Sequence, residues 1–259
     1  MQSLARGLML LEAVSEAEEG ISLSDLAMQV GLAPSTTHRL LNTLEQRGFL
    51  HQDNELGRWH VGVNAFYIGN AFLNIRDFVS HSRPTLRRLM EESGETANLA
   101  VVDDGEAVIL AQIQCHEMMR MMVPLGSRSP LHASGVGKAL MADMDEDQVA
   151  AILHRHGLPA ITEHTIRSAE VLRNALAEVQ AQGWAYDDEE HAIGLRCVAA
   201  AFYDEHGEAL AALSISGPRS RISDARVAQL GRLVADVAAE LTRAIGGKIP
   251  NRPGVVRSA

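Results

Sequence analysis

The sequence predicts an α+β fold in two domains, an N-terminal winged helix-turn-helix and a C-terminal domain of the sensor type. Residues 3–48 carry apolar side chains at helical spacing in three consecutive segments, and two short strand-like segments follow. Beyond Gly94, strand-like and helical segments interleave with hairpins among them, which indicates an α+β sheet rather than a doubly wound parallel one. A chain of 259 residues is long enough for two domains with separate cores.

The composition is that of an ordinary globular protein, with 46% hydrophobic and 22% charged residues. No apolar run reaches the roughly 18 to 20 residues that a membrane helix needs, and glutamates interrupt the apolar patch near the start, which excludes a signal peptide. Cys115 and Cys197 form no CxxC motif, which argues against a disulfide scaffold or a zinc finger. We therefore expect a cytoplasmic protein with no membrane segment.

The net charge of −10 argues against non-specific binding to nucleic acid, because that affinity comes from Lys and Arg neutralising phosphates. Residues 31–60 differ from the rest, since their arginines and acidic residues balance. A small module that contacts bases through short polar side chains, used twice in a dimer, tolerates this balance.

Three helices and a hairpin are expected at the N-terminus. The first helix spans residues 3–16, the second follows Ser22 and ends at Gly31, and the third begins at Pro34 and ends at Gly48. The segment FLHQDNELGRWHVG then places strand formers on both sides of a polar turn. This order is a winged helix-turn-helix, in which the N-terminal residues of the third helix meet base edges in the major groove.

The candidate DNA-binding residues stand at the start of that third helix and on the wing. Hydroxyls donate or accept at bases and phosphates, and a guanidinium reaches guanine or a phosphate. Ser and Thr at a helix start also act as plain caps, and helix-turn-helix shapes occur in protein-contact domains, so both alternatives stay open. The candidates are Ser35, Thr36, Thr37, His38 and Arg39 on the helix and Arg58 on the wing.

Residues 64–93 are expected to be helical with a restart at Pro84, and the part before Pro84 connects the domains. The later elements are a hairpin at 97–114, strands at 120–126, 184–190, 196–204 and 208–217, and helices at 134–144, 146–156, 169–182 and 223–245. The expected domains are a DNA-binding domain at 1–63, a linker helix at 64–80, the C-terminal domain at 81–247 and a tail at 248–259.

The segment HASGVGKAL, residues 132–140, is glycine-rich at a helix start. It is not a phosphate-binding P-loop, because the required spacing is absent and Ala139 replaces the hydroxyl residue. Free N–H groups at Gly135 and Val136 would suit a small anion such as a carboxylate. The alternative is a plain glycine-rich turn capped by Ser134.

Ser214 and Ser216 alternate along one expected strand, so their hydroxyls lie on one face, and Leu195 and Cys197 share a face by the same rule. Two hydroxyls on a buried face are costly unless something bonds them. A polar ligand in the core of the domain would do so, and the neighbouring backbone is the alternative.

No catalytic constellation stands out from the sequence. The acidic run 187–190 could hold a metal, but a solvated loop is the favoured interpretation. Cys197 has no signature of a nucleophile, so a buried small apolar role is favoured over catalysis. Neither HExxH nor a serine nucleophile elbow occurs, so we expect no enzyme, no metal and no cofactor.

Taken in order, several segments resemble the IclR family of bacterial transcription regulators across nearly the whole chain. They are SLARGLMLLEAV, LSDLAMQVGLAPSTTHRLLNTLEQRGFL, HASGVGKA, DDEEHAIGLRCVAA and ALSISGP. The resemblance implies a GAF-like α+β effector-binding domain that holds a small 2-oxo acid, glyoxylate or pyruvate. It implies that the carboxylate meets the amides of Gly135 and Val136, that Asp187, Cys197, Ser214 and Ser216 form the polar lining, and that Leu195, with Met118 and Met121, forms the apolar wall.

Within the family the resemblance is strongest to repressors of the glyoxylate bypass (acetate) operon. It implies a homodimer, pairing into a tetramer, on double-stranded palindromic operator DNA. Two alternatives remain: a family regulator, repressor or activator, of another catabolic operon that senses a different small organic acid, and an enzyme that uses Cys197. Family members commonly carry residues before the QSLARGL stretch, and Val136 replaces a smaller residue at the pocket edge.

Overall fold

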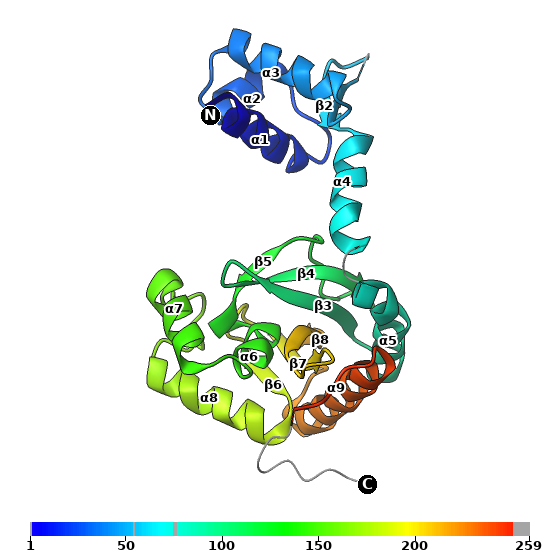
Figure 1. Cartoon of the computed structure of the whole chain (residues 1–259), viewed down its shortest axis with the longest axis vertical. Helices are drawn as coiled ribbons and strands as arrows, with labels where there is room; N and C mark the ends of the chain where they lie inside the picture. Colours follow the sequence, from blue (N-terminus) through cyan, green and yellow to red (C-terminus); the bar gives the residue numbers. More distant parts are fainter. Residues whose placement is uncertain (1, 54, 75–76, 251–259) are drawn as a thin grey trace. The chain divides into compact units, whose positions relative to one another are not determined.

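The computed structural model describes residues 2–53, 55–74 and 77–250. Contacts divide the chain into an N-terminal unit, Met1–Asp77, and a C-terminal unit, Phe78–Ala259 (Figure 1). The division falls within the expected linker helix. Residues 75 and 76 of that linker and residues 251–259 of the expected tail lie outside the described residues.

The N-terminal unit is a winged helix-turn-helix, as the sequence predicts. Its elements are α1 (Gln2–Ser15), α2 (Leu23–Gln29), α3 (Pro34–Gln46), β1 (Leu50–Gln52), β2 (Trp59–Val61) and α4 (Val63–Asn74), with β1 and β2 antiparallel. Each of the first three helices contributes a leucine to one small core, Leu10, Leu26 and Leu41, and Trp59 of the wing packs with them. This shared core fixes the start of α3 relative to the wing.

The expected helix restart at Pro84 is wrong. The structure has a helix α5 (Asp77–Ser93) with Pro84 in its interior. Val79 and Leu86 are buried on either side of the proline, and the hydroxyl of Ser82 donates to the carbonyl of Phe78. Packing on both sides of Pro84 holds the helix together although proline removes one backbone hydrogen bond.

The C-terminal unit is built on a six-stranded sheet, which confirms the α+β prediction. The strands are β3 (Thr96–Asp103), β4 (Glu106–Ile113), β5 (Arg128–Pro130), β6 (Ala185–Asp188), β7 (Leu195–Tyr203) and β8 (Ala209–Pro218). Their order is β5-β4-β3-β8-β7-β6, and every neighbouring pair is antiparallel. The order brings β3, β8, β7 and β6 side by side, although they lie far apart in sequence.

Different helices cover the two faces of this sheet. The remaining elements are the 3-10 turn η1 (Leu131–Ala133) and the helices α6 (Gly135–Met141), α7 (Glu146–His156), α8 (Ala169–Gln182) and α9 (Asp224–Ala244). Cys197, Ala199 and Ala201 of β7 pack with side chains of α6 and α8. Phe202 faces the opposite way, and its ring meets that of Phe78 in α5 at 5.6 Å between centroids. Figure 1 shows α6 and α8 on one side of the sheet and α5 and α9 on the other.

The strand expected at residues 120–126 is also wrong. That segment has no regular structure, and the short edge strand β5 begins after it, at Arg128. Gly126 has a φ of 86° and its N–H donates to the carbonyl of Ile109, which bends the chain into the edge of β4. Met122 and Leu125 of this segment are exposed and Met121 and Val123 are only partly buried, so its apolar pattern reflects no buried strand. None of the described helices has the length and apolarity needed to span a membrane.

An ion pair between a buried carboxylate and a partly exposed guanidinium ties the start of β3 to the loop after β8. Glu95 is 1% exposed, and its carboxylate accepts hydrogen bonds from Arg221 at 2.5 and 2.7 Å. The bidentate geometry compensates the removal of the carboxylate from water. Without Arg221, the Glu95 charge would remain buried and unpaired.

We expect Arg221→Met to lower the free energy of unfolding by about 2 to 4 kcal/mol, because it strands the Glu95 carboxylate. Arg88→Met is the matched control, since Arg88 forms ion pairs with Glu92 and Glu240 at the surface and exposed pairs contribute less than about 1 kcal/mol. Urea unfolding of both variants measures the difference. Equal destabilisation by the two changes would contradict the role assigned to the buried pair.

Candidate DNA-binding surface and effector pocket

The start of α3 presents polar side chains to solvent. Ser35, His38 and Arg39 are exposed and Thr36 is partly exposed. The cap position is Ala33, which makes no side-chain cap hydrogen bond, so neither Ser35 nor Thr36 serves as the cap. These side chains are therefore available for contacts outside the chain.

Thr37 does not belong to this surface, which corrects its expected role. It is fully buried, and its hydroxyl donates to the carbonyl of Ala33 at 3.2 Å. Thr37 precedes buried Leu41 by one helical turn, so both lie on the inner face of α3. The helical spacing of Thr37 and Leu41 in the sequence already indicated that Thr37 faces the core.

Arg58 is largely engaged within the N-terminal unit. Its Nη1 donates to the carbonyls of Glu19 and Gly20, both at 3.3 Å, which ties the wing to the loop after α1. The side chain is only partly exposed. Its first role is to hold the wing, and a phosphate contact would use its remaining N–H groups.

The structure brings the expected pocket residues together in one cavity of about 110 Å³ under the start of α6. Strands β3, β5, β6, β7 and β8 contribute polar side chains to it, and β4 contributes the apolar Ile109. The cavity contains all seven expected residues, Gly135, Val136, Asp187, Leu195, Cys197, Ser214 and Ser216, and Met121 as well. Met118 does not line it, because this side chain is 98% exposed.

Strand register explains why these side chains meet. Asp187 of β6 lies opposite Cys197 of β7, and Cys197 lies opposite Ser216 of β8. Ser214 lies opposite Asn98 of β3. Residues directly opposite in an antiparallel sheet share a face, so a polar row crosses four strands on the face that α6 covers.

Sequence reasoning missed Asn98, which organises the two serines. Asn98 is 1% exposed, and its Nδ2 donates to the hydroxyls of Ser214 at 3.2 Å and Ser216 at 3.3 Å. Gln112 fixes the amide by donating to the Asn98 Oδ1 at 2.8 Å. The two serine hydroxyls thus accept hydrogen bonds from a side chain instead of bonding to neighbouring backbone groups. Each hydroxyl keeps its own hydrogen to donate. An asparagine inside an apolar strand was the available signal.

The start of α6 supplies backbone donors. Ser134 caps the helix, with its hydroxyl accepting from the N–H of Gly137 at 3.1 Å. Among the described residues, none accepts from the N–H groups of Gly135 and Val136, which line the cavity. The two sequence alternatives therefore coexist: Ser134 is a cap, and two amides remain free as first-turn donors.

Asp187 lies at the centre of the polar row and is 3% exposed. Burial raises the pKa of its carboxyl to about 7, with the nearby Glu190 carboxylate raising it further and Lys138 opposing both. Its Oδ1 accepts from the backbone N–H of Glu190 at 2.8 Å. Near neutral pH a large fraction of Asp187 is protonated and can donate to a bound anion.

The acidic run is not a solvated loop, contrary to the favoured expectation. Glu190 is buried and forms an ion pair with Lys138 of α6, and Glu189 is buried beside Arg219 at 2.6 Å. Burial raises the pKa of Glu190 against the opposing effect of Lys138. The partners lie 52 and 30 residues away in sequence, so local charge density could not reveal them. In the part of the chain that the structure describes, no three His, Cys, Asp or Glu side chains form a group that could hold a metal.

Cys197 is a buried thiol, as expected. Burial, and then the charge of Asp187, raise the pKa of this thiol to about 12. It is therefore protonated at neutral pH, and a thiol is a poor nucleophile compared with its thiolate. This environment opposes the alternative of an enzyme that uses Cys197.

Comparison with known proteins assigns both units. The family model for the C-terminal domain of the bacterial transcriptional regulator IclR matches residues 70–243, and the IclR helix-turn-helix model matches residues 3–54. The chain is 52% identical over 249 residues to the acetate operon repressor of Salmonella typhimurium and 51% identical to the transcriptional repressor IclR of Escherichia coli. Each match covers 95% of this chain and 91% of the relative.

A solved structure agrees with this assignment. The crystal structure of the Thermotoga maritima IclR is similar with a TM-score of 0.80 and 26% identity, covering 95% of this chain and 99% of that one. The curated relatives are transcriptional repressors and not enzymes. The chain belongs to the IclR family of bacterial transcriptional regulators.

Proposed function

We propose that the protein represses a glyoxylate bypass (acetate) operon and that a small 2-oxo acid, such as glyoxylate or pyruvate, controls it from the C-terminal unit. The observation that carries the proposal is the buried polar cavity under α6, in which free amides, two hydroxyls and a protonatable carboxyl converge. Similarity over 95% of the chain to an acetate operon repressor supports the choice of operon.

The donors in the cavity match the atoms of a 2-oxo acid. The carboxylate would accept from the N–H groups of Gly135 and Val136, and the oxo or hydrated carbon would face the hydroxyls of Ser214 and Ser216. Protonated Asp187 would add a donor rather than a repelling charge. A volume of about 110 Å³ lies well below the roughly 300 to 1,000 Å³ of sites for drug-sized ligands, which favours an acid of two or three carbons.

Operator binding is assigned to the exposed start of α3. Ser35, Thr36, His38 and Arg39 would meet base edges and phosphates, while Thr37 holds the helix from inside.

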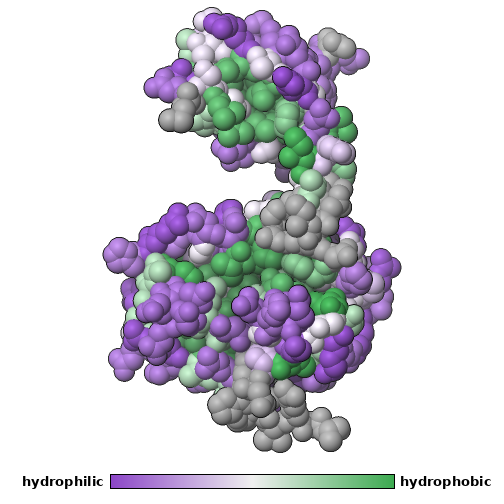
Figure 2. All heavy atoms as spheres, viewed as in Figure 1, coloured by the Kyte–Doolittle hydropathy of each residue, from purple (hydrophilic) through white to green (hydrophobic). Residues whose placement is uncertain are grey.

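The N-terminal unit also exposes apolar side chains on α1 and α4, and Figure 2 shows apolar residues gathered on the face that carries α1. A second copy would cover them and create the two-fold symmetry that a palindromic operator requires. They are Leu4, Leu8, Met9, Val63, Phe66, Tyr67 and Ile68.

Regulation requires that the acid bind with different affinity to the DNA-competent and DNA-incompetent assemblies. Helices α4 and α5 are the covalent route between the two units, so we assign them the role of transmitter. In a tetramer on the operator, each of the two dimers would bind two half-sites, and the acid would act on both dimers in the same way.

Arg39→Ala is expected to weaken operator binding by about 1 to 3 kcal/mol, because it removes an exposed guanidinium from the base-contacting end of α3. Fluorescence anisotropy with a labelled operator at fixed salt measures the loss. Arg173→Ala removes an exposed arginine from α8 and should leave the affinity unchanged. A loss of similar size in both variants would mean that general charge, not α3, determines binding.

A Ser214→Ala, Ser216→Ala double variant is expected to bind glyoxylate tens of times more weakly, since each lost hydrogen bond contributes about 1 kcal/mol. Isothermal titration calorimetry measures the affinity, and Ser220→Ala on the surface is the control. If the double variant kept its full affinity for glyoxylate, the acid would not bind in this cavity.

Affinity for the acid is expected to fall as pH rises through about 7, where Asp187 loses its proton and becomes a repelling carboxylate. Below that pH the protonated form persists and affinity should be constant. Asp187→Asn should remove this pH dependence, because the amide keeps a donor and never ionises. Titrations between pH 5.5 and 8.5 test the sign, and an affinity that increases with pH would refute the role of Asp187.

A further inference from the structure

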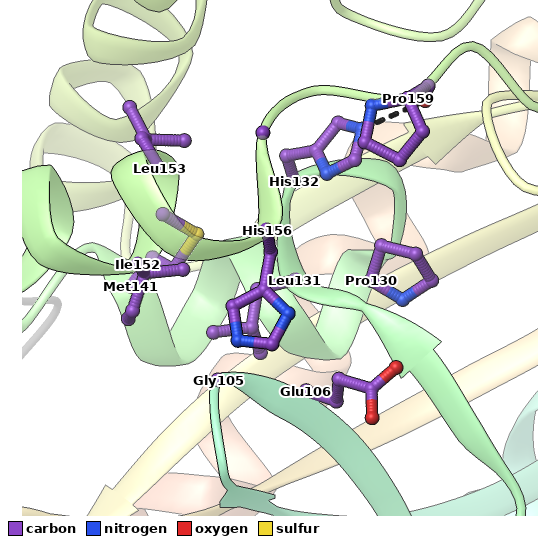
Figure 3. Close-up of a pocket in the computed structure, with 11 residues that line it drawn as sticks. Gly105, Glu106, Pro130, Leu131, His132, Met141, Ile152, Leu153, His156 and Pro159 are labelled. Atoms are coloured by element: carbon purple, nitrogen blue, oxygen red, sulfur yellow. Dashed lines mark hydrogen bonds between the residues drawn. The ribbon is translucent and has the colours of Figure 1, made fainter.

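The C-terminal unit contains a second cavity, of about 140 Å³, which shares no lining residue with the effector pocket (Figure 3). It lies between the turn joining β3 to β4, the η1 turn and the end of α7. Its lining residues are Gly105, Glu106, Pro130, Leu131, His132, Met141, Ile152, Leu153, His156, Gly157 and Pro159.

The walls of this cavity are mostly apolar. Leu131 and Met141 are buried, and Ile152 and Leu153 of α7 are partly buried against the same core. An apolar cavity of about 150 Å³ is large enough to hold benzene. The volume therefore suits one six-membered ring.

His132 places a hydrogen-bond acceptor on the cavity. Its Nε2 lies 3.2 Å from the carbonyl oxygen of Pro159, which can only accept, so Nε2 carries the hydrogen. Burial lowers the pKa of the imidazole against the opposing effect of the Pro159 hydrogen bond, and Lys138 lowers it further, so the ring is neutral near pH 7. In that tautomer Nδ1 is an unprotonated acceptor.

His156 adds a polar atom with no hydrogen-bond partner among the described residues. Its Nε2 is buried from water. The ring occupies the space next to Gly105, where a Cβ would come within 2.6 Å of Nε2. A buried imidazole nitrogen without a partner is costly, and a turn of the His156 ring away from Gly105 would bring it to a ligand hydroxyl in the cavity.

The charged and polar groups of the cavity indicate which kind of ligand it would bind. In the view of Figure 3, His156 lies between His132 and the Glu106 carboxylate. Arg128 contacts Glu106 at 3.3 Å but does not line this cavity. Acceptors therefore dominate, which disfavours anions such as 2-oxo acids and favours a neutral molecule that donates. Gly157 and Pro159 are exposed, so the cavity has a route to solvent.

We propose that this cavity is a second ligand site, for a neutral ring-sized alcohol or phenol whose hydroxyl donates its hydrogen to Nδ1 of His132 or to the Glu106 carboxylate, and whose oxygen accepts a hydrogen bond from Nε2–H of His156. The ring would lie against Leu131, Met141 and Ile152. The site is independent of the acid pocket, so its existence does not depend on which acid the effector pocket binds.

Phenol is the probe, added to the full-length protein with methyl-labelled Met, Ile, Leu and Val in an NMR titration. Saturable shifts are expected at Met141, Ile152 and Leu153, both with and without saturating glyoxylate. Benzoate, an anion of similar size, should not produce them. Shifts confined to Met121 and Val136, displacement of phenol by glyoxylate, or no saturable shift would overturn the proposal.

Two variants localise the site. Ile152→Phe fills the cavity and should abolish the phenol shifts, whereas Val171→Phe, on the exposed face of α8, should retain them. His156→Phe keeps the ring but removes its nitrogens, so phenol should bind roughly 2 to 10 times more weakly while benzene binding is unchanged. Thermal unfolding establishes whether each variant is folded. If Ile152→Phe does not fold, the phenol-to-benzene ratio of His156→Phe decides, and an unchanged ratio would refute the site.

Discussion

Helix α6 starts so close to the sheet and to the η1 turn that two of its first three residues have no room for a side chain. A Cβ at Gly137 would collide with the backbone of Leu131, and one at Gly135 would come within 2.9 Å of the Cys197 Sγ. This approach holds the free amides of the helix start over the polar row of the sheet. It also brings Lys138 to Glu190 in the core, so the pocket and the packing of the domain depend on one contact.

The polar row, together with the Lys138–Glu190 ion pair beside it, costs the fold stability although all of it is buried in the domain. Asp187 and Glu190 are buried, and burial raises the pKa of both. Apolar residues of similar volume would pack there at lower cost, since buried ion pairs are rarely better than a hydrophobic core. Departures from good packing concentrate at functional sites, which is the physical argument for a ligand in this cavity rather than a purely structural role.

Local pattern predicted the winged helix and most strands, because amphipathic spacing and glycine turns are local properties. It failed where distant packing decides: at Pro84, which lies inside α5, and in residues 120–126, which form no strand and whose apolar side chains are exposed or only partly buried. The glycine turn and paired serines pointed to the cavity from sequence. Asn98 was missed although an asparagine inside an apolar strand was a signal, because the serines that it bonds lie 116 and 118 residues further along the chain. The burial of Glu190 could not be anticipated, because its partner Lys138 lies 52 residues away in the sequence.

The central claim is that an acid in the buried cavity controls binding of α3 to an operator. Fluorescence anisotropy on a glyoxylate bypass promoter fragment, at fixed salt, with and without glyoxylate or pyruvate, tests it most directly. The account predicts tight binding to the fragment and a change in affinity when one of these acids is added. Tight binding that neither acid alters would contradict the claim, because the cavity would then have no connection to repression.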